Sequence, residues 1–174
     1  EDGATHHGVF DIAYLRCIPN MIIYAPKDEL DLQNILYTAS LGLPNPIAIR
    51  YPRGRGKYSN LEFRIQNLEF EKIEIGKAHL LKNGTKTAVL STGFIGNNVS
   101  IALENRNQPE TIAHYDFGFI KPLDEKLLHE IFSSFEAIIT IEDGTIKGGF
   151  GSAIVEFSAE NNYSKPIKVL GIPD

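Results

Sequence analysis

A polar loop at the start of the chain carries the first residues that could do chemistry. Asp2 and His6 lie four positions apart, and an apolar stretch begins at Val9. Imidazole titrates near neutral pH and a nearby carboxylate can orient it, so this pair suits proton transfer. Two alternatives remain open. One is a surface loop without chemistry, and the other is a metal site, which is disfavoured because the adjacent side chains of His6 and His7 point apart.

A basic turn is the second candidate, and it reads RYPRGRGK from Arg50 to Lys57. Within it, Arg53 follows a rigid proline and precedes a glycine. A guanidinium group makes bidentate hydrogen bonds to phosphate, and a flanking glycine lets the anion approach. The alternative is a solvated basic linker. Nucleic acid is a poorer candidate because the cluster is short and the chain has 22 acidic against 17 basic residues.

A glycine-rich segment from Glu142 to Gly151 is the third candidate. It resembles a dinucleotide-binding turn but lacks the third glycine and a suitably placed acidic residue. The simpler interpretation is that its glycines allow close packing, while Glu142 and Asp143 face solvent. Cys17 has no histidine near it in the sequence, and we interpret it as a small buried apolar residue.

Apolar patterning predicts the elements that position these residues. In the first part of the chain it predicts helices over residues 8–17 and 28–41 and strands over 21–24 and 47–49. Farther along, Asn83-Gly84 is typical of a tight turn, so we predict a hairpin of strands 77–81 and 87–90.

From residue 87 onward, predicted strands and helices alternate. The strands cover residues 88–91, 111–115, 137–141 and 167–170, and the helices include residues 95–103, a segment that starts at Pro122, and 151–160. This order predicts an α/β fold with a mostly parallel sheet covered by helices on both faces. Ligands of such sheets bind beyond the carboxyl ends of the strands.

Composition narrows the class of protein. The chain has 174 residues, of which 43% are hydrophobic and 22% charged, as in ordinary soluble globular proteins. It has no apolar stretch near the roughly 18 to 20 residues that span a bilayer. A single cysteine excludes an internal disulfide, so we expect a cytoplasmic protein. Because the chain begins with Glu1 and its only methionine is Met21, we also expect it to be a piece of a longer protein.

Several strings carry a family resemblance that composition and spacing do not show. They are DGATHHGVFD from Asp2, YLRCIPNM from Tyr14, AIRYPRG from Ala48, FIKPLD from Phe119, and Glu142-Asp143 followed by GGFG. They occur in this order over almost the whole chain. Together they resemble the 1-deoxy-D-xylulose-5-phosphate synthases, thiamine-diphosphate enzymes of the transketolase superfamily.

This resemblance implies a domain order. Residues 1–57 would be the C-terminal part of a pyrimidine-binding domain, residues 58–73 a linker, and residues 74–174 a transketolase C-terminal-like domain truncated at its end. The first 55 residues offer only about two strands and two helices, too few for a complete open sheet. The family also implies a homodimer, and neither nucleic acid nor membrane is expected as a partner.

The resemblance further implies a reaction. Pyruvate and glyceraldehyde 3-phosphate would condense with loss of CO2 to give 1-deoxy-D-xylulose 5-phosphate, for isoprenoid, thiamine and pyridoxal biosynthesis. In the family motif, the histidine matching His6 lines the active site, Asp2 precedes it, and the arginine matching Arg53 binds the phosphate of the aldehyde. His7 receives no role. Thiamine diphosphate and Mg2+ would be anchored mainly upstream, so no metal or cofactor ligand is assigned here and the isolated chain is expected to be inactive.

Other functions remain open at this point. A transketolase or the β subunit of a 2-oxoacid dehydrogenase would share the cofactor. Arg53 argues against the latter, whose acceptor is a lipoyl group rather than a phosphorylated sugar. A non-catalytic interaction domain is the alternative from a different class.

Overall fold

The first candidate loop leads into a small helix and strand unit. A computed structural model of the chain describes residues 6–54, 70–105 and 109–173. The first of these ranges contains α1 (Asp11–Arg16), β1 (Ile22–Tyr24), α2 (Glu29–Ser40) and β2 (Ile47–Ile49). The order agrees with the sequence prediction, although α1 begins later than expected because residues 9 and 10 form a turn.

Helix α2 has a side-chain cap at its first turn, and its buried face is partly polar. The Asp28 side chain caps the helix by accepting a hydrogen bond from the Asp31 amide at 2.9 Å. The buried face carries Thr38, whose Oγ1 accepts a hydrogen bond from the Ile73 amide at 2.9 Å. Leu36 has the spacing of the apolar residues on this helix, one turn after Leu32, but is 53% exposed. The predicted linker, residues 58–73, lies partly outside the described residues.

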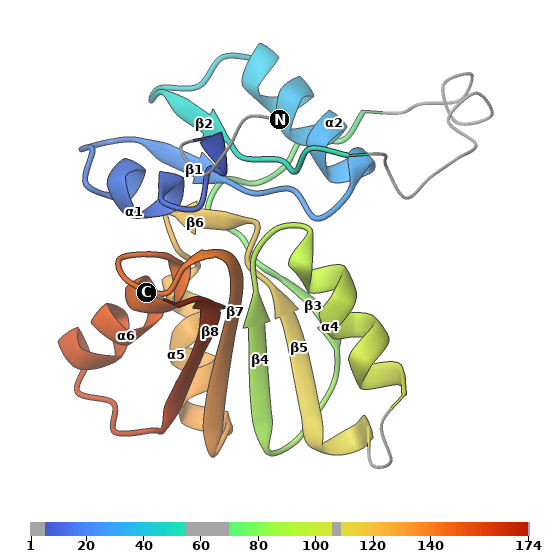
Figure 1. Cartoon of the computed structure of the whole chain (residues 1–174), viewed down its shortest axis with the longest axis vertical. Helices are drawn as coiled ribbons and strands as arrows, with labels where there is room; N and C mark the ends of the chain where they lie inside the picture. Colours follow the sequence, from blue (N-terminus) through green and yellow to red (C-terminus); the bar gives the residue numbers. More distant parts are fainter. Residues whose placement is uncertain (1–5, 55–69, 106–108, 174) are drawn as a thin grey trace.

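The second half of the chain forms a larger sheet, which lies below the first unit in Figure 1. Its strands are β3 (His79–Lys82), β4 (Thr87–Ser91), β5 (Ile112–Asp116), β7 (Ala137–Thr145) and β8 (Ile167–Ile172), in the order β3-β5-β4-β7-β8. All neighbouring pairs are parallel except β3 with β5. A short 3-10 turn (Pro109–Thr111) precedes β5. The predicted mostly parallel sheet is confirmed.

Helices cover both faces of this sheet. Successive side chains of each strand point to opposite faces, and both faces carry apolar residues that must be buried. Helix α4 (Ile95–Glu104) packs on the face that carries Val89 and Ile139. Helices α5 (Glu125–Ser134) and α6 (Phe150–Glu160) pack on the opposite face, against Leu90 and Ile138. Figure 1 shows α4 on one side of the strands and α5 and α6 on the other.

The predicted hairpin around Asn83-Gly84 is wrong. Strand β3 pairs with β5, and β4 lies on the other side of β5. The connection crosses the start of β5, where the Lys86 amide donates to the Thr111 carbonyl at 2.9 Å. A Cβ atom on Gly84 would lie 2.1 Å from the Ala113 nitrogen. The glycine is therefore needed for close passage of two backbones rather than for a primed turn.

A short strand that the sequence analysis missed joins the two halves of the chain. Strand β6 (Phe119–Lys121) pairs antiparallel with β1, in a sheet of order β2-β1-β6. The rings of Phe119 and Tyr24 meet edge to face with centroids 4.5 Å apart. A strand from the second half thus completes the sheet of the first.

The start of α5 also differs from the prediction. Pro122 follows β6 and is not the first residue of the helix, which begins at Glu125. Asp124 caps the helix instead, and its Oδ1 accepts a hydrogen bond from the Leu127 amide at 3.1 Å. A carboxylate at this position satisfies an amide that the first helical turn leaves unpaired, which explains where the helix starts.

Candidate active site

The loop predicted to do proton transfer rests on the end of β7. Asp2 lies outside the described residues, and His6 is exposed at the beginning of the described chain. Beyond it, the Val9 carbonyl accepts a hydrogen bond from the Thr145 amide at 2.8 Å. The segment from His6 to residue 10, called the histidine loop below, is therefore supported by the large sheet.

Arg50 links this loop to two other elements. Its Nε lies 3.0 Å and 2.8 Å from the two carboxylate oxygens of Asp11, the first residue of α1. One terminal nitrogen pairs with the carboxylate of Asp143 in β7, and the other lies 3.5 Å from the Gly8 carbonyl. The side chains of Arg50 and Asp11 are only 16% and 18% exposed. Arg50 therefore belongs to a partly buried ion-pair network and not to a solvated linker.

Arg53, three residues farther on, lies in a different environment. It is exposed and lines a pocket of about 300 Å³. The other lining residues come from the β1–α2 junction, from α2, from the turn after β2 and from the residue before α4: Pro26, Lys27, Asp28, Glu29, Leu32, Tyr51, Pro52, Gly54 and Phe94. His6 is not among the described residues that line this pocket. The structure therefore places Arg53 in a concave site with a partly apolar wall.

One of the residues that line the pocket, Lys27, belongs to a cluster of ionisable side chains. The Lys27 ammonium is 2.8 Å from an Asp31 carboxylate oxygen and 3.7 Å from one of Asp116. Neither oxygen of Asp116 has a hydrogen-bond partner among the described residues, and burial raises the pKa of this carboxyl group to about 7. Burial lowers the pKa of Lys27, but the two carboxylates outweigh it and the net pKa is raised. Lys27 is thus held in place as a cation.

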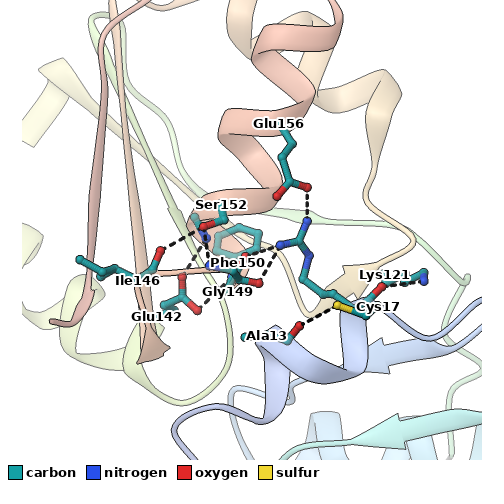
Figure 2. Close-up of polar contacts among 12 residues, drawn as sticks. Ala13, Cys17, Lys121, Glu142, Ile146, Gly149, Phe150, Ser152 and Glu156 are labelled. Atoms are coloured by element: carbon teal, nitrogen blue, oxygen red, sulfur yellow. Dashed lines mark hydrogen bonds and ion pairs between the residues drawn. The ribbon is translucent and has the colours of Figure 1, made fainter. Parts of the chain in front are cut away.

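The glycine-rich segment does not form a nucleotide site. Glu142 is buried, and its two carboxylate oxygens accept hydrogen bonds from the Phe150 and Gly151 amides at 2.9 Å and 2.8 Å. A side chain of the protein therefore occupies the start of α6, as Figure 2 shows. Burial raises the pKa of Glu142, and the two amides oppose this. The prediction that Glu142 faces solvent is wrong, because it satisfies the helix terminus.

The glycines of this segment also contact α1. Arg16 donates to the carbonyls of Gly148 and Gly149 at 2.7 Å and 3.0 Å and pairs with Glu156 of α6 (Figure 2). Cys17, expected to be buried, is exposed at the end of α1, since the helix stops there and turns its last residue toward solvent. The packing role predicted for the glycines agrees with these contacts.

A buried serine and histidine in the large sheet resemble a catalytic nucleophile with its base, but their role is structural. Ser91 Oγ lies 2.7 Å from Nε2 of His114, and both residues are completely buried. Burial, with a smaller contribution from the charge of Lys82, lowers the pKa of His114 to about 4. A neutral, enclosed imidazole without access to a substrate stabilises the sheet and does no chemistry.

The described residues offer no ligand cluster for a magnesium ion. No cluster of three or more His, Cys, Asp or Glu side chains in residues 6–54, 70–105 and 109–173 could hold a metal ion. Mg2+ prefers several oxygen ligands, which one or two carboxylates alone do not supply. In the same ranges, every helix is too short or too polar to cross a bilayer.

Comparison with known proteins identifies the family. Residues 1–57 match the transketolase pyrimidine-binding domain, and residues 76–174 match the transketolase C-terminal domain. The chain belongs to the transketolase family. This confirms the fold class and the resemblance that the sequence motifs indicated.

Close relatives and a solved structure extend this result. The 1-deoxy-D-xylulose-5-phosphate synthases of Parabacteroides distasonis and Cytophaga hutchinsonii are 51% and 47% identical over 100% and 99% of the chain. The chain spans 27% of the length of each. A solved structure titled "Split gene transketolase, inactive beta4 tetramer" superposes with a TM-score of 0.78 at 26% identity, covering 99% of this chain and 55% of that one.

Three residues of this region were not singled out by sequence reasoning. Asp11 was quoted only as part of a motif, and Lys27 and Asp116 were not considered at all. A signal existed for Asp116, which stands at the carboxyl end of the parallel strand β5, where sheets of this class bind ligands. No local signal marks Lys27, because its nearby partner Asp31 forms an ordinary i,i+4 ion pair and Asp116 comes from a distant segment.

The raised pKa of Asp116 predicts how stability depends on pH. The folded state keeps this proton up to about pH 7, whereas an unfolded aspartate loses it near pH 4. The contribution to stability is therefore lost as the pH rises from about 4 to 7. At pH 8, Asp116→Asn should be more stable than the parent by on the order of 2 kcal/mol, and the difference should disappear at pH 4.

Denaturant unfolding at both pH values measures this difference. Glu136→Gln, which removes a carboxylate at the surface, is the matched control for loss of one negative charge. Equal stability differences at pH 4 and pH 8 for Asp116→Asn would show that this carboxyl group does not titrate as described.

Proposed function

We propose that the chain is part of a 1-deoxy-D-xylulose-5-phosphate synthase that condenses pyruvate with glyceraldehyde 3-phosphate and releases CO2. The main support is the 51% identity over the full chain to a curated protein of that name. The product would serve isoprenoid, thiamine and pyridoxal biosynthesis. Within this proposal, residues 1–57 end the pyrimidine-binding domain, 58–73 are a linker, and 74–174 are the C-terminal domain.

The pocket beside Arg53 supports a phosphorylated substrate. A guanidinium group binds a phosphate through paired hydrogen bonds, and Lys27 adds a second cation to the same wall. Leu32 and Phe94 supply apolar surface for a short carbon chain. We assign Arg53 to the phosphate of glyceraldehyde 3-phosphate.

His6 and Asp2 complete the substrate side of the proposed site. The reaction moves protons on and off substrate oxygens, which suits an exposed histidine at the end of a supported loop. We assign His6 to this proton transfer and Asp2 to its orientation. His7 has no assigned role.

Thiamine diphosphate and Mg2+ are proposed for the whole protein. Since no cluster of His, Cys, Asp or Glu side chains among the described residues could hold a metal ion, we place Mg2+ and the diphosphate that it binds elsewhere in the protein and derive no step through the cofactor. The isolated chain is then inactive. The related split-gene transketolase, whose title describes an inactive β4 tetramer, supports this part of the proposal. A cytoplasmic homodimer is the proposed state of the whole protein.

Alternative functions have weaker support. A sugar-transferring transketolase would share the family domains, but the relative found at 26% identity is more distant than the synthases. A lipoyl-dependent dehydrogenase subunit would have no use for a phosphate-binding arginine. Release of CO2 from pyruvate that depends on glyceraldehyde 3-phosphate, measured on the full-length protein, separates these activities.

Arg53→Ala in the full-length protein tests the phosphate site. The KM for glyceraldehyde 3-phosphate should rise by about 10-fold or more, because a charge-assisted bidentate contact is lost. The KM for pyruvate should change by less than about 2-fold, since pyruvate carries no phosphate. Lys126→Ala, an exposed cation on α5, is the control for loss of a charge. An unchanged KM for the aldehyde would remove Arg53 from the site.

His6→Ala in the full-length protein tests the proton-transfer role. The kcat should fall by about 10²-fold or more, the range typical of acid and base groups. The adjacent His7→Ala should stay near the parent value. Steady-state kinetics with both substrates saturating gives the comparison. Near-normal turnover of His6→Ala would reject the assignment.

A further inference from the structure

Arg50 lies at a junction that the proposed function does not use. Asp11 begins α1 directly after the histidine loop, Asp143 belongs to β7, and Arg50 itself follows β2. The three side chains meet although they are 39 and 93 positions apart in the chain. The same arginine therefore touches the segment that presents His6 and directly precedes the turn that presents Arg53.

The contacts of Arg50 restrain the loop more than a single ion pair would. The Nε–H of Arg50 is shared between both carboxylate oxygens of Asp11, and Oδ1 of Asp11 also accepts a hydrogen bond from the Ile12 amide at 2.8 Å. The contact with the Gly8 carbonyl reaches into the loop itself, where Gly8 has a positive φ of 65°. A planar guanidinium group can serve these acceptors together, whereas an ammonium group cannot hold them in one geometry.

Asp143 gives the network an anchor in the large sheet. Its side chain is 35% exposed, and the neighbouring Glu142 is fixed by the start of α6. Thr145, two residues later, holds the Val9 carbonyl through its amide. The end of β7 thus supports the histidine loop twice, once through its backbone and once through Arg50.

We propose that Arg50 is a positioning residue, which fixes the histidine loop relative to the Arg53 turn through Asp11, Gly8 and Asp143. The inference rests on the proposed function, since it assigns Arg50 an effect that passes through His6. Arg50 itself does not touch the substrate. Acid and base groups lose much of their effect when displaced by about 1 Å, so a loosened loop lowers turnover without removing any reacting group.

Arg50→Lys in the full-length protein tests this role. The variant keeps the charge but loses the geometry, and kcat should fall by about 10-fold or more while the KM for pyruvate changes less than about 2-fold. Arg16→Lys is the matched control, because Arg16 also joins α1 to the second half of the chain but contacts neither loop. It should lower the melting temperature as much as Arg50→Lys does and leave kcat near the parent value.

A double-mutant cycle distinguishes positioning from a general structural effect. If Arg50 acts through His6, Arg50→Lys should lower kcat by less than about 2-fold when His6 is already alanine. An equal loss in both backgrounds would overturn the inference, and so would a loss of kcat in Arg16→Lys as large as in Arg50→Lys. If His6→Ala alone has near-normal turnover, the proposed proton-transfer role fails first, and the inference fails with it. If His6→Ala is impaired and the cycle is additive, only the inference fails.

Discussion

Arg50 forms ion pairs with Asp11 and Asp143. In our account, the arrangement of the histidine loop and of the Arg53 turn depends on these two ion pairs. The Arg50 side chain is largely buried, which reduces solvent screening of its ion pairs, and removal of either carboxylate would leave the guanidinium group with a single charged partner. Through it, the segment before α1 and the segment after β2 share one reference point at the end of β7. The large sheet therefore acts as the support for the first unit.

A second connection joins α1 to the start of α6, away from both candidate loops. Glu142 closes that helix terminus by accepting from two amides, and next to it the Gly148 and Gly149 carbonyls accept hydrogen bonds from Arg16 of α1. Gly149 has no room for a side chain, since a Cβ atom there would lie 2.1 Å from a Glu142 oxygen. The glycine-rich segment is thus a contact between the two halves of the chain.

Local patterns predicted much of this fold, and the errors occur where distant segments decide. The alternation of predicted strands and helices from residue 87 onward was sufficient to predict a covered, mostly parallel sheet. Strand β6 was missed because it is short and its partner β1 is nearly 100 positions away. The hairpin prediction failed because Asn83-Gly84 carries a local turn signal, whereas β5 inserts between the two strands. Residue spacing and the motif resemblance both drew attention to Arg53, but only the structure shows that Arg50, in the same segment, has a different environment.

Amide hydrogen exchange on the full-length protein measures most directly whether the large sheet supports the histidine loop. In Asp143→Asn, the account predicts faster exchange of the amides of residues 9–12 and of the Thr145 amide, which donates to Val9. Amides of α2, which has its own cap and core contacts, should exchange at the parent rate. Unchanged exchange in residues 9–12 would contradict the account, because the loop would then be held without Arg50 and its anchor.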